Sequence, residues 1–348
     1  MPALPIRVVH LPVEFVTRGT LQPWLGPAVR GMVLCPLMEH MCILDPHDRA
    51  IRLARMQHEI EPRYCQGCEK NAECSYGRIW EPDRKLIDGF VRGGMRDGLR
   101  ALTIGAIPLS VDPSSPLKPQ VATLRVLAAG ELAIRNLDTV VDMVSKQGES
   151  VGLGRESIRF RVIRQHTSVQ DCPLNFDELP LVLDRETVPE VTLDLQTPLL
   201  LKIAERQENS ASSLNNHRSF SRRFTFRDLL SNSVRTVRRA INEFADSEWS
   251  RSTNLSSLFE GLESIELSET GLRPFSQSRT SLRKNGARWD LNGFQGQVTC
   301  YDINAAYLPW LRWAGVLGVG DSRNCSAGVW KISGQLSVVS CQLLVVSC

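Results

Sequence analysis

The chain has 348 residues, of which 42% are hydrophobic and 23% are charged, and its formal net charge is +3. This length accommodates two domains of ordinary size, and the composition excludes a disordered chain. The small net charge does not require a nucleic-acid partner, but local basic patches can still serve one.

The sequence shows no recognisable membrane-spanning segment or secretory signal. No apolar run approaches the ~20 residues that span a bilayer. Residues 1–10 contain one arginine and two prolines and lack the apolar region of a secretory signal. We therefore expect a cytoplasmic protein with no membrane partner. In that setting the ten cysteines indicate metal ligands and buried thiols rather than a disulfide framework.

The first half of the chain alternates strand and helix signals. Residues 6–15 predict a strand, and residues 25–42 predict a helix that Pro36 would end or kink. Residues 124–132 read as extended, and residues 137–146 predict a helix with one apolar face.

Residues 158–162 predict a half-buried strand. Ile158, Phe160 and Val162 alternate with Arg159 and Arg161, so the outer face of this strand would be cationic.

The second half has a similar order of signals. An acidic, proline-containing segment, residues 171–190, predicts a linker, and residues 191–202 predict a strand. Residues 226–244 have the apolar periodicity of a helix. Residues 297–301 are rich in β-branched and aromatic side chains and predict a strand, after which a helix begins near Tyr307.

A helix, a G-x-G turn and a strand occur twice. Gly152 and Gly154 recur as Gly318 and Gly320, an offset of 166 residues (318 minus 152). A repeat of this length predicts two similar domains. The order of elements favours an α+β protein made of two tandem ferredoxin-like (RRM-like, βαββαβ) domains.

The expected boundaries follow from these signals. Residues 1–170 form the first domain, with a cysteine-cluster insertion at about residues 42–80. Residues 191–332 form the second domain, which carries the glycine-rich loop. In residues 333–348 the tetrapeptide V-V-S-C occurs twice, and we expect this tail to be an unstructured appendage.

The spacing Cys65-x-x-Cys68-x5-Cys74 is the most specific local motif. Two thiolates separated by two residues fit one edge of a zinc tetrahedron. A third nearby indicates a closed, structural site made of four cysteines, or of three cysteines and one histidine. Cys42 is the preferred fourth ligand, and Cys35, His40 and His58 are the alternatives. Three free cysteines or an iron–sulfur cluster are the competing interpretations.

The candidate acid–base residues are histidines. RNA cleavage needs a base for the 2′-hydroxyl and an acid for the leaving 5′-oxygen, and histidine titrates in the right range for both. His40 and His47 are the two candidates, because they lie near the arginine-rich residues 49–55. A lone histidine is more often structural than catalytic.

Basic residues gather in residues 218–239 and again in residues 279–288. Such runs are commonly solvated faces, and the alternative is a surface that follows phosphates. Glycines 315, 318 and 320 form, on shape alone, a tight helix-to-strand turn.

Several segments share their spacing with one known family. They are L-N-G-F-Q-G-Q-V-T-C-Y (residues 291–301), L-P-W-L-R-W-A (308–314), G-V-G-D-S-R-N-C-S-A-G-V-W-K-I (318–332), G-L-G-R-E-S-I-R-F-R-V (152–162), L-Q-T-P-L-L-L-K (195–202), R-T-V-R-R-A-I-N (235–242) and C-Q-G-C-E-K-N-A-E-C-S-Y-G (65–77). On these segments the chain resembles the RAMP-superfamily endoribonucleases that process CRISPR precursor RNA, the sixth numbered Cas family, in a form with a cysteine cluster. The sequence departs from that family at Ala327, where a glycine is usual, and Asp321 adds a negative charge to the loop.

The resemblance implies metal-independent cutting of CRISPR repeat RNA, with a 2′,3′-cyclic phosphate and a 5′-hydroxyl as products. No catalytic metal is expected, and zinc would be structural, held by Cys42, Cys65, Cys68 and Cys74. Subunits of a CRISPR effector complex would be further partners. The implied RNA-binding residues are Arg155, Arg159, Arg222, Arg223, Arg279, Arg283, Lys284, Gly315, Gly318, Gly320, Arg323, Gly328 and Lys331.

Two other functions compete with this one. A non-catalytic RAMP subunit would bind guide RNA without cutting it. A zinc-stapled interaction protein would have no role with RNA.

Overall fold

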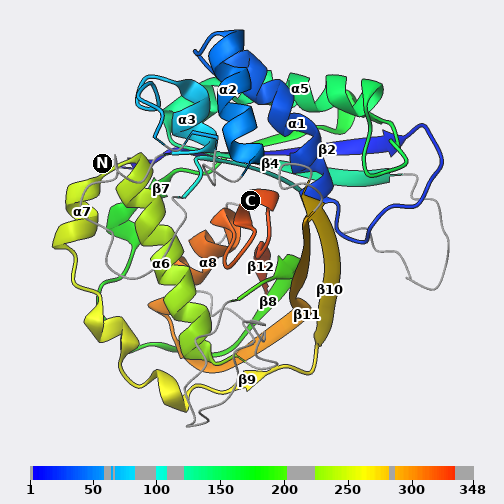
Figure 1. Ribbon diagram of the computed structural model, residues 1–348. Helices are drawn as coiled ribbons and strands as arrows, with labels where there is room; N and C mark the ends of the chain where they lie inside the picture. Colours follow the sequence, from blue (N-terminus) through cyan, green and yellow to red (C-terminus); the bar gives the residue numbers. More distant parts are fainter. Residues whose placement is uncertain are drawn as a thin grey trace, which may run out of the picture.

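The computed structural model describes residues 3–58, 64, 65, 67–82, 99–107, 121–201, 224–281 and 287–333. These residues form two modules joined along a broad contact surface, which we call the seam (Figure 1). The first module contains the strands β1 (Ala3–Leu4), β2 (Ile6–Phe15), β3 (Leu102–Ile107), β4 (Val121–Ala129), β5 (Phe160–Val162), β6 (Ser168–Asp171) and β7 (Leu174–Asn175). Its helices are α1 (Gly26–Met41), α2 (Pro46–Gln57), α3 (Ser75–Trp80), α4 (Glu131–Arg135) and α5 (Leu137–Ser150), with the 3-10 turns η2 (Arg164–His166) and η3 (Phe176–Glu178).

The second module begins with β8 (Thr187–Leu199). Its other strands are β9 (Leu267–Ser268), β10 (Leu272–Ser281), β11 (Ala287–Asn304) and β12 (Trp330–Ser333). Its helices are α6 (Phe226–Phe244), α7 (Ser247–Ser252) and α8 (Tyr307–Leu317), with the 3-10 turns η4 (Ser256–Phe259), η5 (Leu262–Ser264) and η7 (Arg323–Cys325).

The two main sheets have the same topology. Their strand orders are β3-β4-β2-β5 and β10-β11-β8-β12, and every pair along these paths is antiparallel. If the four strands of each sheet are numbered in chain order, both sheets have the order second, third, first, fourth. In each module helices follow the first strand and the third strand. This is the βαββαβ plan, so the expected α+β fold of two tandem ferredoxin-like units is confirmed.

The repeated glycines mark equivalent positions in the two modules. Gly152 follows α5 with φ of 80°, and Gly318 follows α8 with φ of 78°. The second pair, Gly154 and Gly320, also has positive φ, at 70° and 88°. The offset read from the sequence therefore corresponds to one turn that is built twice.

Helix α6 shows why local sequence and fold agree. Thr225 accepts a hydrogen bond from the Asp228 backbone N–H, and the Asp228 carboxylate accepts one from the Thr225 N–H, which completes a capping box. Its apolar stripe is buried in the core of the second module. That stripe comprises Leu229, Leu230, Val234, Val237, Ala240 and Ile241.

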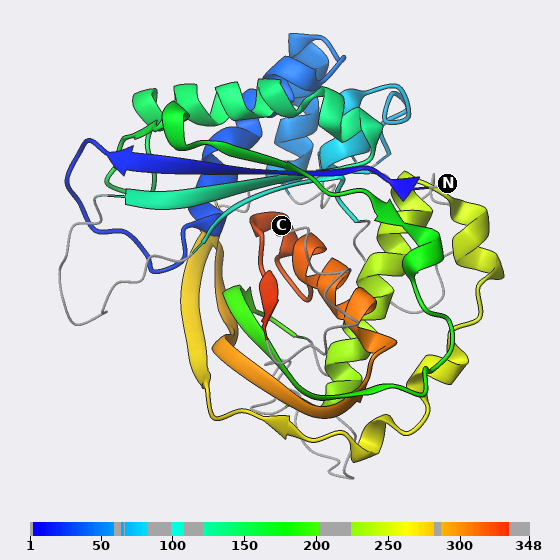
Figure 2. The same cartoon turned by 180° about the vertical axis from the view of Figure 1, so that it is seen from behind.

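The first sheet is covered on both faces. Helices α1 and α5 lie on one face, and α8 and β12 lie on the other (Figures 1 and 2). Ile6, Val8 and Leu127 point to the second face and join the same buried cluster as Val191 and Trp310. The seam is therefore part of the hydrophobic core, and the two modules share that core rather than being separate domains joined by a linker.

Several sequence expectations need correction. The strand expected over residues 158–162 begins only at Phe160, because Ser157 has a φ of 51° and Ile158 bridges back to Leu153. Pro36 does not end its helix, which continues to Met41. The extended segment expected to reach Leu132 ends at Ala129, and α4 starts at Glu131.

The segment expected as a linker contains packed structure. Leu174, Phe176 and Leu179 are buried in the shared core, and β8 starts inside the segment at Thr187. At the other end of the chain, Ser333 is the last residue of β12, and the rest of the expected tail lies outside the described residues.

Candidate nucleic-acid interface

The glycine-rich loop after α8, residues 318–328, lies at the seam, and we call it the seam loop. It is held to its own module through backbone hydrogen bonds: Asp321 N–H donates to Leu200 O at 2.7 Å, and Gly328 N–H donates to Pro198 O at 2.9 Å. A Cβ atom on Gly328 would overlap the Val319 carbonyl oxygen, so only glycine closes the loop here. The loop is therefore fixed in shape.

The other side of the seam loop contacts the first module. The Cys325 carbonyl oxygen lies against the backbone of Gly26, at the start of α1, and of Gly105, in β3. Just before the loop, the Arg125 Nη2 of β4 donates to the Val316 carbonyl at 2.5 Å. Arg125 is 4% exposed. Its hydrogen bond crosses the seam and satisfies one of the carbonyl groups at the C-terminal end of α8, which have no partner within the helix.

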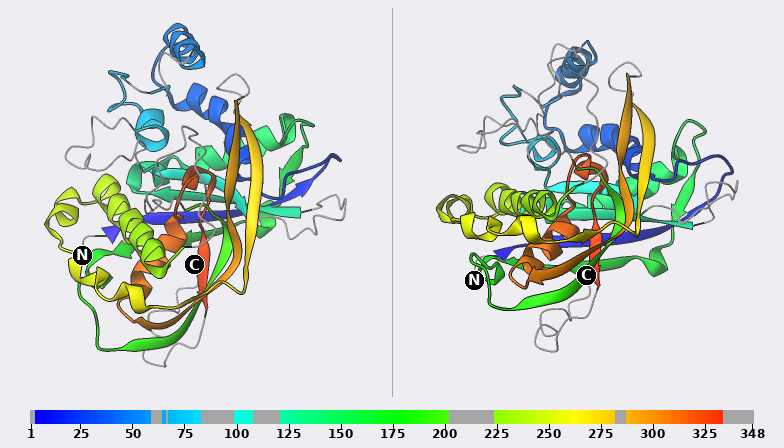
Figure 3. Two further views of the ribbon diagram at one scale, coloured as in Figure 1. Left: turned by 60° about the horizontal axis from the view of Figure 1, so that its bottom comes forward. Right: turned by 90° about the horizontal axis from the view of Figure 1, so that it is seen from below.

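A second tie runs through β10. The Gln277 side chain accepts a hydrogen bond from Trp24 N–H at 3.1 Å and donates to Trp24 O at 2.9 Å. The Trp24 and Phe275 rings meet edge to face at 6.1 Å between centroids. Figure 3 shows the β10–β11 hairpin reaching the first module beside α1. These contacts fix the orientation of one module on the other.

A buried ion network supports the seam loop. Arg239 and Glu243 of α6 form an ion pair at 3.0 Å, with side chains 16% and 4% exposed. Burial, and then the nearby Arg239, lower the pKa of Arg323 to about 10, while Glu243 and Asp321 oppose this shift. Burial raises the pKa of Glu243, and Arg239 opposes that shift. Arg323 is thus tied electrostatically to α6.

A second cluster of basic residues, His10, Arg125 and Lys331, joins the two sheets. His10 of β2 is opposite Arg125 of β4 in the register and lies near Lys331 of β12. Burial, then Arg125 and then Lys331 lower the pKa of His10 to about 4. The imidazole is therefore neutral at pH 7, and the positive charge here belongs to Arg125 and Lys331.

The structure separates the residues implied for RNA binding. Arg155, Arg159 and Lys331 are exposed. Gly318, Gly320, Arg323 and Gly328 share the seam loop, whereas Gly315 is buried in α8 against the Trp330 indole. Arg279 lies in β10, and Arg222, Arg223, Arg283 and Lys284 lie outside the described residues.

Three of the four arginines of α6 are engaged by other groups of the protein. Arg238 donates to the Ser250 carbonyl at 2.8 Å, Arg239 pairs with Glu243, and Arg227 pairs with Glu263. Arg227 and Arg238 hold α6 to neighbouring segments, Arg239 pairs within the helix, and Arg235 is exposed, so most of this part of the basic run serves the fold.

The two candidate catalytic histidines are exposed. His40 lies in the last turn of α1 and His47 in the first turn of α2. The seam loop contacts α1 at Gly26, and fourteen residues at ~1.5 Å each give ~21 Å of helix between Gly26 and His40. Figure 1 shows α1 beginning at the seam and ending near α2 at the outer edge of the molecule.

The cysteine cluster is gathered in space. Cys42, Cys65 and Cys74 are buried and Cys68 is partly exposed. Burial raises the pKa of Cys65, and the nearby Glu81 and the other three thiols raise it further. The donor set has the chemistry of a zinc site, but within the described residues no three metal-binding side chains surround a common point. Cys42 Sγ instead contacts Tyr64 Oη at 3.5 Å.

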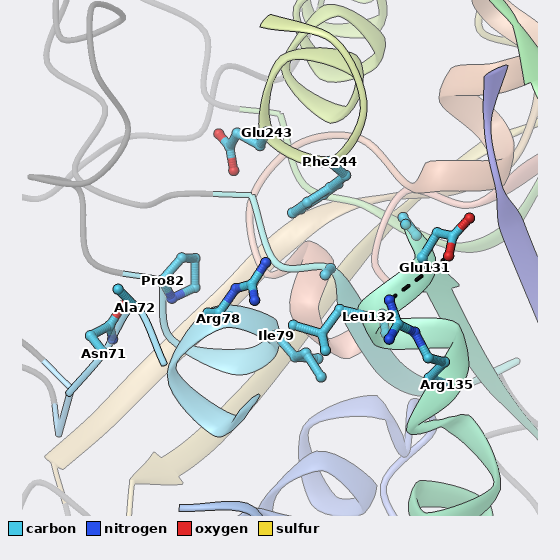
Figure 4. A pocket seen from close by; sticks show the side chains of 14 residues that line it. Asn71, Ala72, Arg78, Ile79, Pro82, Glu131, Leu132, Arg135, Glu243 and Phe244 are labelled. Atoms are coloured by element: carbon cyan, nitrogen blue, oxygen red, sulfur yellow. Dashed lines mark ion pairs between the residues drawn. The ribbon is translucent and has the colours of Figure 1, made fainter. Parts of the chain in front are cut away.

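A cavity of about 530 Å³ lies between this cysteine-bearing segment and α6. Arg78, Leu132 and Phe244 project into it, and Glu131 and Arg135 pair at its edge (Figure 4). Its lining is mixed in charge, because it contains the carboxylates of Glu131 and Glu243 and the guanidinium groups of Arg78 and Arg135.

Sequence patterns did not reveal the residues that tie the modules together. Arg125 carried one signal, since it is a lone charge in the otherwise apolar run L-R-V-L-A-A. Gln277 carried none, because its partner Trp24 is 253 positions away, and Glu243 carried only its i,i+4 spacing from Arg239.

Comparison with known proteins gives matches in structure only. No protein-family model and no curated protein matches the chain. Solved structures that are similar to it include Cas6 and RAMP proteins. A Cas6 product complex is 14% identical with a TM-score of 0.45, covering 96% of this chain and 100% of that chain. A partial Cas6-RT-Cas1–Cas2 complex is 14% identical with a TM-score of 0.42, covering 97% and 47%.

A third neighbour is the product of a Cas6-related gene from Pyrococcus furiosus. It is 10% identical with a TM-score of 0.41, covering 96% of this chain and 100% of that chain.

No described helix has the length and apolar character needed to cross a membrane.

Proposed function

We propose that the chain is an endoribonuclease that cuts the repeat RNA of CRISPR precursor transcripts without a catalytic metal. The observation that carries this proposal is the seam loop, a fixed glycine-bearing loop with Arg323 between two βαββαβ modules. Backbone N–H groups and arginines of such loops suit phosphate oxygens. The sequence resemblance supplies the substrate class.

The reaction would be a transesterification within the RNA. The 2′-oxygen attacks the adjacent phosphorus while its proton passes to a base, and the bond from phosphorus to the 5′-oxygen breaks as that oxygen takes a proton from an acid. The products are a 2′,3′-cyclic phosphate and a 5′-hydroxyl. His40 and His47 are the proposed acid–base residues, and nearby Arg49 supplies positive charge for the phosphorane.

A second function is favoured by one specific distance. The ~21 Å of helix between Gly26 and His40 separates the proposed acid–base residues from the seam loop. RNA would have to follow α1 to reach both. If it does not, the chain would be a non-catalytic RAMP subunit that binds RNA in a CRISPR effector complex.

One experiment separates these functions. Purified protein is incubated with CRISPR repeat RNAs in EDTA, and the products are mapped at nucleotide resolution. A single cut that leaves a 2′,3′-cyclic phosphate supports the enzyme. Salt-dependent binding without a cut supports the subunit, and no binding at low salt supports a zinc-stapled interaction protein.

A further inference from the structure

A small polar cavity of about 160 Å³ lies in the seam and is lined in part by the seam loop, on which the proposed function also rests. Leu99, Arg100 and Thr103 of the first module line one side, and Asp321, Arg323 and Asn324 of the seam loop line the other. The cavity is larger than the ~30 Å³ that one water molecule occupies in the liquid. It can therefore hold a small polyatomic ion.

Two hydrogen-bond donors in this cavity lack acceptors. Thr103 is 5% exposed, and its Oγ1 has no hydrogen-bond partner within the described part of the chain. The Nη1 of Arg100 is also buried and, among the same residues, unpartnered. Because buried polar groups are normally satisfied, both atoms indicate an acceptor that the described residues do not provide.

The charges around the cavity also favour an anion as the missing acceptor. Arg100 and Arg239 both act electrostatically on Arg323, and the opposing groups are Glu243 and Asp321. Among the described residues, three guanidinium groups thus face two carboxylates, and one of these carboxylates, Glu243, is already engaged by Arg239 at 3.0 Å. This group of five side chains carries one excess positive charge in a partly buried region, where a bound anion is favoured.

We propose that the cavity binds a phosphate-type oxyanion, held by the guanidinium groups of Arg100 and Arg323 and by the Thr103 hydroxyl. Arginine donors match the oxygens of such an anion, and the hydroxyl supplies a third hydrogen bond. The source is either free inorganic phosphate or a phosphodiester of bound RNA. The site spans both modules, so its occupation strengthens the seam whether or not RNA is cut.

Inorganic phosphate is the probe for the test. Thermal unfolding of the whole chain is measured in phosphate and in chloride at equal ionic strength. At ten times its Kd, phosphate should raise Tm by about 2 °C relative to chloride. Arg100→Gln and the isosteric Thr103→Val should each weaken phosphate binding, measured by calorimetry, by about tenfold or more.

Two controls keep the test decisive. Arg164→Gln removes an exposed arginine that pairs with Asp142 and should leave the phosphate effect unchanged. Arg100→Lys keeps the charge and should retain part of the affinity if Arg100→Gln fails to fold. An equal Tm in phosphate and chloride, or an undiminished phosphate effect in Thr103→Val, would overturn the proposal.

RNA binding then identifies the source of the anion. If the site holds an RNA phosphate, inorganic phosphate competes with RNA and Thr103→Val weakens RNA binding. If it holds a free ion, RNA affinity is unchanged in Thr103→Val while the phosphate effect is lost. Failure of RNA cutting leaves the phosphate measurement unaffected, so the two proposals fail independently.

Discussion

The carbonyl oxygen of Cys325 occupies the space in which a Cβ atom on Gly105 would lie. Gly105 belongs to β3 of the first module and Cys325 to the seam loop, so this contact crosses the seam. The same oxygen also leaves no room for a Cβ atom on Gly26. These two glycines therefore determine how closely the modules approach each other.

Substituting Gly105→Ala should force the seam loop away from β3. We expect the free energy of unfolding to fall by about 1–3 kcal/mol, the usual cost of overpacking, measured by urea denaturation. Gly31→Ala is the matched control, since among the described residues nothing beyond the neighbouring backbone of α1 lies within 4 Å of its added Cβ. That change should stabilise α1 by about 0.5–1 kcal/mol. A Gly105→Ala protein as stable as the wild type would mean that the seam tolerates a gap.

Protonation of His10 should weaken the fold at low pH. Its pKa is lowered from 6.5 to about 4 by burial and then by Arg125 and Lys331. Between these two values the unfolded state binds more protons than the folded state, so stability falls as pH falls. The stabilisation is fully present above pH 6.5, and we expect about 1–3 kcal/mol to be lost by pH 4.

Urea denaturation across this pH range checks the His10 prediction. His10→Gln should flatten the decline, because the titrating group is gone. His166→Gln, which alters an exposed histidine in η2, should retain it. An unchanged slope in His10→Gln would assign the pH dependence to other groups.

Loss of a catalytic histidine should separate binding from cutting. His40→Ala or His47→Ala should slow repeat-RNA cleavage by about 10²–10⁴-fold while leaving RNA affinity within a few-fold. Single-turnover cleavage and filter binding measure the two effects, and His166→Ala serves as the control. If both variants cut at the wild-type rate, neither histidine is the acid or the base.

Zinc content is the direct test of the cysteine cluster. Protein purified without added metal should contain about one zinc per chain if four thiolates close a site. Cys65→Ser and Cys42→Ser should each lose the metal and destabilise the first module, whereas Cys35→Ser should keep it. Metal-free wild-type protein, or loss of metal in Cys35→Ser, would contradict the proposed ligand set.

Local sequence determined much of the fold. The strand expected over residues 6–15 and the helix expected over residues 226–244 have the predicted bounds, because their apolar periods are long and Thr225 and Asp228 cap the helix. The repeated glycine turn also predicted two equivalent modules. Where local cues were short, as around Ile158, a tight turn from Leu153 took precedence over alternation.

The interface was less accessible to sequence reasoning. Arg323 was expected as a ligand for RNA, and the sequence offered no sign that Glu243 and Arg239 surround it. Contacts such as Trp24 with Gln277 join residues 253 positions apart, so no local pattern encodes them. The cysteine spacing predicted the gathering of the thiols but not the Tyr64 hydroxyl beside Cys42.

The position of the seam loop near the end of the described chain has a consequence for biosynthesis. Ile6, Val8 and Leu127 emerge from the ribosome long before α8, the seam loop and β12, which later cover them. During that interval the first module carries an uncovered apolar sheet face, the condition under which multidomain chains aggregate. Assembly of the molecule therefore ends with the elements that shield its earliest strands.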